Sequence, residues 1–273
     1  INFHFKTSDD LEVYEIDQVS KEKLEEVCDF RQPVMFDFED DKFITNTSVK
    51  FLEDNYHAFD MKIRNTTEVN NENDIYIPLP VHSAMKLFRE DKSSSYYTES
   101  NSDLLQETGV LKTFQYNDEY LRPYMVSNCN YDILTGSYKA TTPFRYELNY
   151  RNYFLVTSGK ITIKMAPPKS SKYLFVIYDY ENFEFLSPVN PWNVQSMYRA
   201  DFDKVKFLDI KLIAGQIIYI PSYWWYSIEF GKESSLATFK YKTYMNTVAI
   251  LPQLVMKLLQ TQNVKRNNVA TVS

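Results

Sequence analysis

The stretch that decides the fold reads AGQIIYIPSYWWY and covers residues 214–226. Gly215 permits a tight turn into a strand. The next residues alternate between two faces of that strand, with Ile217, Tyr219 and Pro221 on one face and Ile218 and Ile220 on the other. Trp224 and Trp225 add a large apolar area where the chain re-enters the domain. The stretch therefore predicts a core strand of an all-β domain.

Short strand-like runs lie on both sides of this stretch. Turn signals separate them, among them Gly136, Gly159 and Pro188. Many short strands with punctuated turns are typical of antiparallel sandwiches and barrels. The runs cover residues 131–135, 143–148, 152–157, 160–165, 172–179, 207–213, 216–220, 224–229 and 236–243.

Helices are expected mainly outside the β-rich region. Ser20 is suited to cap a helix that begins at Lys21, and Pro80 precedes an expected helix over residues 81–88. Residues 248–260 carry apolar side chains at helical spacing. Their apolar stripe is wide for a terminal helix, so it fits either packing on its own domain or dimerisation.

Composition argues against several classes of protein. The 273 residues carry a net charge of -6, and basic residues are interspersed with acidic ones, so no nucleic-acid partner is expected. No apolar run is long enough to span a membrane and no signal peptide is visible, which favours an intracellular, cytoplasmic protein. Cys28 and Cys129 form neither a zinc motif nor a disulfide framework, so two reduced thiols are expected.

Four landmarks follow one another in the chain. The first is Gly136-Ser137 leading to TTPFRYE at 141–147, and the second is NYFLV at 152–156 followed by SGK at 158–160 and Pro167-Pro168. The third is SPVNPW at 187–192, and the fourth is the stretch at 214–226. In this order they resemble the Jumonji-C and cupin-like oxygenases, especially the asparaginyl hydroxylase that acts on hypoxia-inducible factor, over roughly residues 80–245.

The resemblance implies a mainly β fold with flanking helices, a double-stranded β-helix of the jelly-roll type. We expect three parts: an N-terminal α+β extension packed on the barrel over residues 1–80, the double-stranded β-helix core over 81–247, and an amphipathic helix with a tail over 248–273.

The family's iron ligands are missing from this sequence. Enzymes of the family hold Fe(II) with a His-x-Asp/Glu pair and a distant His, which leave positions open for 2-oxoglutarate and oxygen. The corresponding positions here read Arg145-Tyr146-Glu147 and Tyr226, and Ile161 replaces the lysine that binds 2-oxoglutarate. An Arg side chain offers no lone pair to a metal. The only histidines lie upstream of the β-rich region: His4, His57 and His82. We therefore expect no metal, no cofactor and no catalytic residue.

The vacated metal position needs another occupant. Arg145 and Glu147 are two residues apart on a strand and share a face, so we predict that they pair there, with Tyr226 as a hydrogen-bond partner. The expected pocket walls are Thr142, Asn152, Ile161, Tyr219 and Trp225.

Three functions fit these observations. The first is an inactive structural or interaction scaffold that binds a protein partner or a second copy through residues 248–260. The second is a binding module for a small molecule or peptide, in which Arg145 contacts a carboxylate or phosphate. The third is a 2-oxoglutarate-dependent oxygenase (a hydroxylase) with an unorthodox metal site. Richness in Asn, Lys, Tyr, Phe and Ile suggests an AT-rich coding sequence, and the chain resembles cupin-like proteins of large DNA viruses. If the chain is viral, a virion-associated role is expected.

Overall fold

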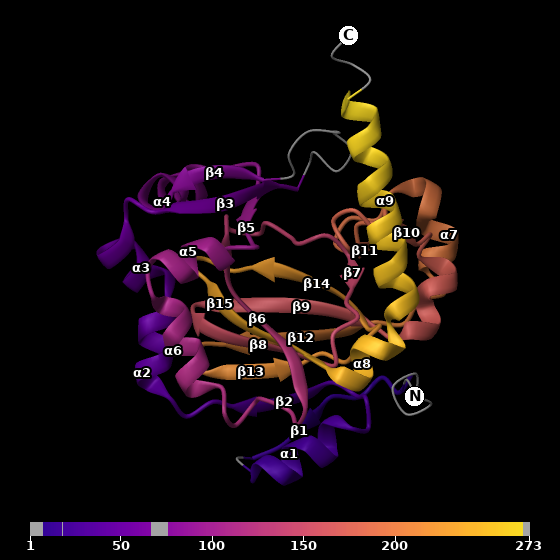
Figure 1. The fold of residues 1–273 in the computed structure, drawn as a ribbon, viewed down its shortest axis with the longest axis horizontal. Helices are drawn as coiled ribbons and strands as arrows, with labels where there is room; N and C mark the ends of the chain where they lie inside the picture. Colours follow the sequence, from indigo (N-terminus) through magenta and orange to yellow (C-terminus); the bar gives the residue numbers. More distant parts are fainter. Residues whose placement is uncertain (1–7, 18, 67–75, 270–273) are drawn as a thin grey trace.

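The computed structural model describes residues 8–17, 19–66 and 76–269, and two β-sheets form its centre (Figure 1). The nine-stranded sheet has the order β1-β2-β13-β8-β15-β6-β5-β3-β4, and the six-stranded sheet has the order β10-β11-β7-β14-β9-β12. Neighbouring strands are antiparallel except for β1 and β2, which are parallel. This arrangement is the expected mainly β fold with flanking helices.

The strands of the nine-stranded sheet come from the whole length of the chain. They are β1 (Tyr14–Glu15), β2 (Val34–Asp37), β3 (Asp60–Asn65), β4 (Ile77–Pro80), β5 (Tyr96–Thr98), β6 (Val126–Gly136), β8 (Arg151–Ser158), β13 (Gln216–Tyr219) and β15 (Ser235–Thr243). The six-stranded sheet consists of β7 (Arg145–Tyr146), β9 (Lys160–Ala166), β10 (Ile177–Asp179), β11 (Glu184–Leu186), β12 (Leu208–Ile213) and β14 (Trp225–Phe230). The N-terminal segment thus contributes strands to the same sheet as the barrel core.

The helices surround the sheets. They are α1 (Lys21–Cys28), α2 (Asp41–Thr47), α3 (Val49–Tyr56), α4 (Val81–Glu90), α5 (Ser102–Glu107), α6 (Val110–Asn117), α7 (Arg199–Phe202), α8 (Tyr244–Ala249) and α9 (Leu251–Val269). Ser20 caps α1 as expected, because its hydroxyl accepts a hydrogen bond from the Lys23 backbone amide at 3.3 Å. In Figure 1, α2, α3 and α6 lie at one side of the sheets and α9 at the other.

Two apolar layers hold the sheets in place. One layer fills the space between the two sheets and includes Phe154, Ile163 and Ile228. The other lies between the nine-stranded sheet and helices α1–α6. Along β13, Ile218 and the following Ile220 belong to the layer between the sheets, whereas Tyr219 faces the helices. Strand alternation therefore points Tyr219 away from the barrel interior.

Two expected elements differ from the structure. Residues 172–179 are not one strand: a 3-10 helix, Pro168–Tyr173, precedes the short β10. Pro168 fits the start of a helical turn because its ring fixes φ and it has no N–H to leave unpaired. The expected helix over 248–260 is divided into α8 and α9 at Ile250. Pro252 lies in the first turn of α9, where the missing N–H is tolerated.

Within the described ranges, no helix has the length and apolar character needed to cross a bilayer. Cys28 is buried, Cys129 is half-buried, and neither forms a disulfide.

Candidate functional site

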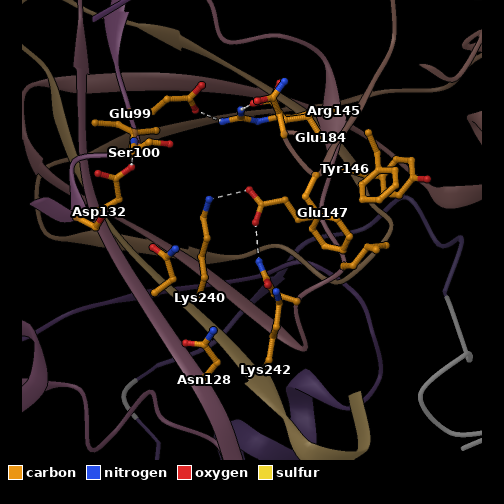
Figure 2. A pocket seen from close by; sticks show the side chains of 18 of the residues that line it. Glu99, Ser100, Asn128, Asp132, Arg145, Tyr146, Glu147, Glu184, Lys240 and Lys242 are labelled. Atoms are coloured by element: carbon orange, nitrogen blue, oxygen red, sulfur yellow. Dashed lines mark hydrogen bonds and ion pairs between the residues drawn. The ribbon is translucent and has the colours of Figure 1, made fainter. Parts of the chain in front are cut away.

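A cavity of about 360 Å³ opens where the two sheets diverge. Its wall is formed by β6 and β15 of the nine-stranded sheet, by β7 and β11 of the six-stranded sheet, and by the segment that follows β5 (Figure 2). The side chains that line it are mostly polar. They include Glu99, Ser100, Asn128, Asn130, Asp132, Arg145, Tyr146, Glu147, Asn149, Asn182, Phe183, Glu184, Lys240 and Lys242.

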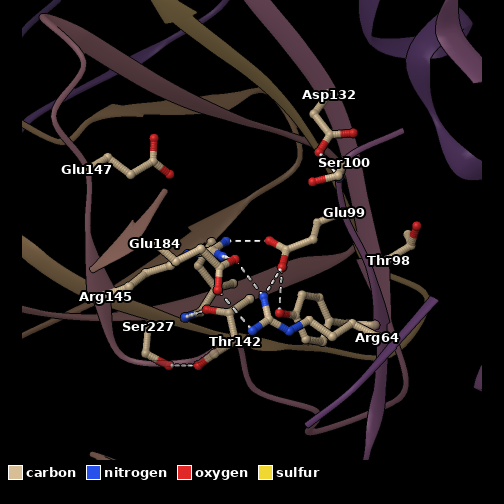
Figure 3. Close-up of polar contacts among 12 residues, drawn as sticks. Arg64, Thr98, Glu99, Ser100, Asp132, Thr142, Arg145, Glu147, Glu184 and Ser227 are labelled. Atoms are coloured by element: carbon tan, nitrogen blue, oxygen red, sulfur yellow. Dashed lines mark hydrogen bonds and ion pairs between the residues drawn. The ribbon is translucent and has the colours of Figure 1, made fainter. Parts of the chain in front are cut away.

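One end of the cavity holds a closed network of buried charges, which we name the charge quartet: Arg64, Glu99, Arg145 and Glu184. Glu99 accepts hydrogen bonds from Arg64 at 2.8 Å and from Arg145 at 2.5 Å. Glu184 accepts two bonds from Arg64, at 2.8 and 3.1 Å, and its carboxylate lies 3.6 Å from Arg145. The four side chains are between 6% and 13% exposed. Figure 3 shows them converging from β3, β7, β11 and the end of β5.

The ion pairs of the charge quartet favour the charged forms of Glu99 and Arg145. Burial alone would raise the pKa of Glu99, but the Arg145 and Arg64 guanidiniums outweigh it and hold that pKa well below its usual range. Burial would lower the pKa of Arg145, and the charge of Glu99 outweighs it in the same way, so this pKa lies well above its ordinary value. The phenol of Tyr97 donates a further bond to Glu99 at 2.8 Å.

A second cluster forms around Glu147. Its carboxylate accepts hydrogen bonds from Lys240 at 2.8 Å, from Asn149 at 2.7 Å and from the phenol of Tyr226. Burial would raise the pKa of Glu147, but Lys240 and Arg145 outweigh it and lower that pKa. Burial, followed by the charge of Glu147, raises the pKa of Tyr226 well above its ordinary value, so Tyr226 stays a neutral phenol.

The comparison with protein families agrees with this architecture. The model of the cupin-like domain matches residues 6–246, which is most of the chain. The chain belongs to the cupin-like domain family. No curated protein matches it.

The structure brings together Arg145, Glu147 and Tyr226, the three residues that the sequence resemblance places at the family's metal position, but it pairs them differently. Tyr226 and Arg145 are direct cross-strand neighbours, and the Arg145 guanidinium lies 5.9 Å from the centre of the Tyr226 ring. Tyr226 donates to Glu147 as expected. The expected ion pair between Arg145 and Glu147 is wrong: Arg145 pairs with Glu99 and Glu184, and Glu147 pairs with Lys240.

The residues expected as pocket walls lie elsewhere in the cupin-like domain. Thr142 accepts from the Ile228 amide, Asn152 donates to the Ile220 carbonyl, and Ile161 packs between the sheets. Tyr219 faces the N-terminal helices. Trp225 packs on Phe144, because it precedes the inward-facing Tyr226 and strand alternation turns it outward.

Of the side chains at positions 145, 147 and 226, only Glu147 is suited to bind iron, because a guanidinium offers no lone pair and Tyr226 is a neutral phenol. Among the described residues, no group of three or more His, Cys, Asp or Glu side chains has the geometry to hold a metal ion. His82 lies on α4, where its ring bonds to the carbonyl of His57 at 3.0 Å, and His4 lies outside the described residues.

Several site residues escaped prediction from the sequence. Arg64, Glu99 and Glu184 lie outside the landmarks that carry the resemblance; Arg64 and Glu184 are on short strands, and Glu99 directly follows β5. A usable signal was present for the others: Asn128, Asn130 and Asp132 alternate along one strand, and so do Lys240 and Lys242. Polar residues at every second position of a strand indicate one polar face.

Proposed function

We propose that this cupin-like domain is a catalytically inactive relative of the Jumonji-C oxygenases that works as a structural or interaction scaffold, intracellular or in a virion. The observation that carries the proposal is the charge quartet, in which two carboxylates hold Arg145, the residue that the sequence resemblance puts at the family's first iron-binding histidine. A guanidinium offers no lone pair to a metal, and it supplies the positive charge that buried carboxylates require.

The other two ligand positions support the same proposal. Tyr226, at the position that the sequence resemblance gives to the distal histidine, donates a hydrogen bond to Glu147. Glu147 already receives bonds from three side chains: Tyr226, Lys240 and Asn149. A metal at this place would have to displace Lys240 and lie next to Arg145, which is unfavourable for a second cation.

Titration with Fe(II) and 2-oxoglutarate tests the proposal directly. We expect the purified chain to contain no stoichiometric metal by elemental analysis. Fe(II) added under anaerobic conditions should leave the Tm unchanged, and 2-oxoglutarate should not be converted to succinate. The physical reason is that the vacated metal position already holds a paired cation.

The control is the same chain stripped with EDTA. A Tm increase caused by 2-oxoglutarate only when Fe(II) is present would contradict the proposal and would make the oxygenase the leading function. A shift that 2-oxoglutarate causes equally with EDTA reports binding of its carboxylates alone.

A scaffold needs an association surface, and α8 with α9 supplies one. Ile250 is buried and Leu254 packs against the body of the protein. Other apolar side chains of these helices face outward, with exposures of 42% to 65%: Tyr244, Met245, Val248, Leu251, Val255, Met256, Leu258 and Leu259. Figure 1 shows α9 extending beyond the sheets. Residues 244–262 contain one charged residue, Lys257, so charge repulsion barely opposes contact between two copies despite the net charge of -6.

We therefore expect self-association through this surface. Leu258→Asp should weaken the dimer at least about tenfold, because it places a charge in an apolar contact. Sedimentation analysis over a concentration series measures the effect. Met197→Asp is the matched control, since Met197 is 76% exposed and lies elsewhere. A wild-type chain that is monomeric at every concentration would exclude a second copy and leave a different protein as the partner of α9.

A further inference from the structure

The cavity has a second polar region, distinct from the charge quartet, on the sheet formed by β6 and β15. Cross-strand pairing places Asn128 opposite Lys242 and Asn130 opposite Lys240. These four side chains point into the cavity, while the alternate residues Tyr131, Phe239 and Tyr241 belong to the apolar core on the other face. The two strands thus present a ladder of amide and ammonium groups. In the view of Figure 2, Asn128 and Lys242 lie at the opposite end of the cavity from Arg145.

Of the two lysines on this ladder, only Lys240 forms an ion pair with a residue that the structure describes. Lys240 is neutralised by Glu147 at 2.8 Å. Lys242 has no ion pair with any residue that the structure describes, and its neighbours include Lys240 and Lys257. Lys242 and Lys257 lie 5.4 and 5.2 Å from the centre of the Phe183 ring. Glu147 is an acidic neighbour of Lys242, but it already accepts three hydrogen bonds and forms its ion pair with Lys240.

The lowered pKa of Lys242 is consistent with an ammonium group that lacks an anionic partner. Burial is the main cause that lowers the pKa of this ammonium group, and the charges of Lys257 and Lys240 lower it further against the opposing effect of Glu147. An anion beside the ammonium group would relieve this cost. The amide side chains of Asn128 and Asn130 make no hydrogen bond within the ranges 8–17, 19–66 and 76–269, so their donors and acceptors are free for a ligand.

We propose that Lys242, with Lys240 and the amide of Asn128, binds the anionic group of a small polar molecule, a carboxylate or a phosphate. The cavity of about 360 Å³ is large enough for a small metabolite. Its remaining lining, Ser100, Asp132 and Asn149, offers partners for hydroxyl or amino groups, and Phe183 offers a ring face. Arg145 is not assigned this role, because its charge is already balanced by the carboxylates of Glu99 and Glu184. The inference goes beyond the scaffold proposal and requires no metal.

The test uses the full chain in EDTA, so that iron plays no part and the result is separate from the Fe(II) titration. Inorganic phosphate and malonate are titrated in turn while backbone amide shifts are followed by NMR. We expect changes centred on β6 and β15 with saturation below about 10 mM, as for a weak single-group ligand. Response to phosphate alone or malonate alone would identify the anionic group, and response to both would show that the site accepts either.

Two variants remove the site in different ways. Lys242→Gln deletes the charge, and Asn128→Asp supplies an internal anion opposite Lys242 on an exposed position of β6. Each should weaken binding about tenfold or more. Lys211→Gln is the charge-matched control, because Lys211 is exposed on β12, and it should bind as the wild type does. Absence of binding to the wild type, or equal binding by all three variants, would overturn the proposal.

Discussion

Replacing Glu99 by glutamine is expected to lower the free energy of unfolding by about 3–5 kcal/mol, the usual cost of removing one partner from a buried ion pair. Glu99 joins both arginines of the charge quartet and also accepts a bond from Tyr97. In Glu99→Gln, the two buried guanidiniums share a single carboxylate, that of Glu184. The N–H groups of the new amide also face the N–H groups of the arginines, which cannot accept a hydrogen bond. Urea denaturation followed by circular dichroism measures the loss.

Two control variants distinguish a stability loss caused by the unpaired guanidinium from one caused by altered packing. Glu107→Gln makes the same chemical change at an exposed position of α5 and should alter stability by less than about 0.5 kcal/mol. Adding Arg145→Met to Glu99→Gln leaves Arg64 paired with Glu184, so it should recover a large part of the loss. No recovery would mean that the cost lies in shape and not in the unpaired guanidinium.

The same variant should change how stability depends on pH. The pKa of Glu99 is lower in the folded protein than in the unfolded chain. The stability that its charge contributes is therefore fully present above the unfolded value of about 4.3, and it is lost as the pH falls through the folded value. The difference between wild type and Glu99→Gln should be constant above about pH 5 and shrink on acidification below it.

Restoring the family's ligands should create a metal site. We expect the combined variant Arg145→His, Tyr226→His and Lys240→Met to bind one Co(II) or Fe(II) per chain. Positions 145 and 226 are cross-strand neighbours, Glu147 supplies the carboxylate, and removal of Lys240 frees that carboxylate from its ion pair. Two His and one carboxylate are a sufficient ligand set for such ions. At a hundredfold excess over Kd, the metal should stabilise the variant by about 2.7 kcal/mol.

The comparison variant carries one introduced histidine, whereas the three-ligand variant carries two. Arg145→His, Tyr226→Phe and Lys240→Met should bind metal far more weakly, and EDTA should reverse the stabilisation of the three-ligand variant. Cobalt absorbance gives an independent measure of coordination. A folded three-ligand variant that takes up no metal would show that residues 145, 147 and 226 do not converge as ligands do, and it would contradict their assignment to the family's metal position.

The sequence was sufficient for the fold but only partly for the site. Glycine turns, prolines and the alternation at 214–226 act locally, so they predict β13 and β14. The sequence resemblance also pointed to Arg145 and Tyr226 as residues of one site, and the structure makes them cross-strand neighbours. The partners of Arg145 could not, because Glu99 and Glu184 reach it through the pairing of strands that are far apart in the chain. A buried cation demands an anion, but the sequence does not tell which carboxylate supplies it.

The sequence also did not show whether the side chain of each expected wall residue points into the cavity or away from it. Alternation predicts two faces for a strand and does not tell which face is inner. Trp225 and Tyr219 were expected in the pocket because large aromatic residues often line pockets. Their neighbours Tyr226 and Ile218 point inward instead.

The charge quartet also favours the native strand register over shifted registers. Its members come from β3, from the end of β5, from β7 and from β11, and β7 pairs with β11 through only two residue pairs. Such a short ladder specifies its register weakly. A slip by one residue would turn Arg145 or Glu184 to the opposite face and leave the remaining charges of the network unpaired. Misregistered states of this edge are thereby raised in energy relative to the native one, so the ions contribute to uniqueness of structure even where an apolar core would be equally stable.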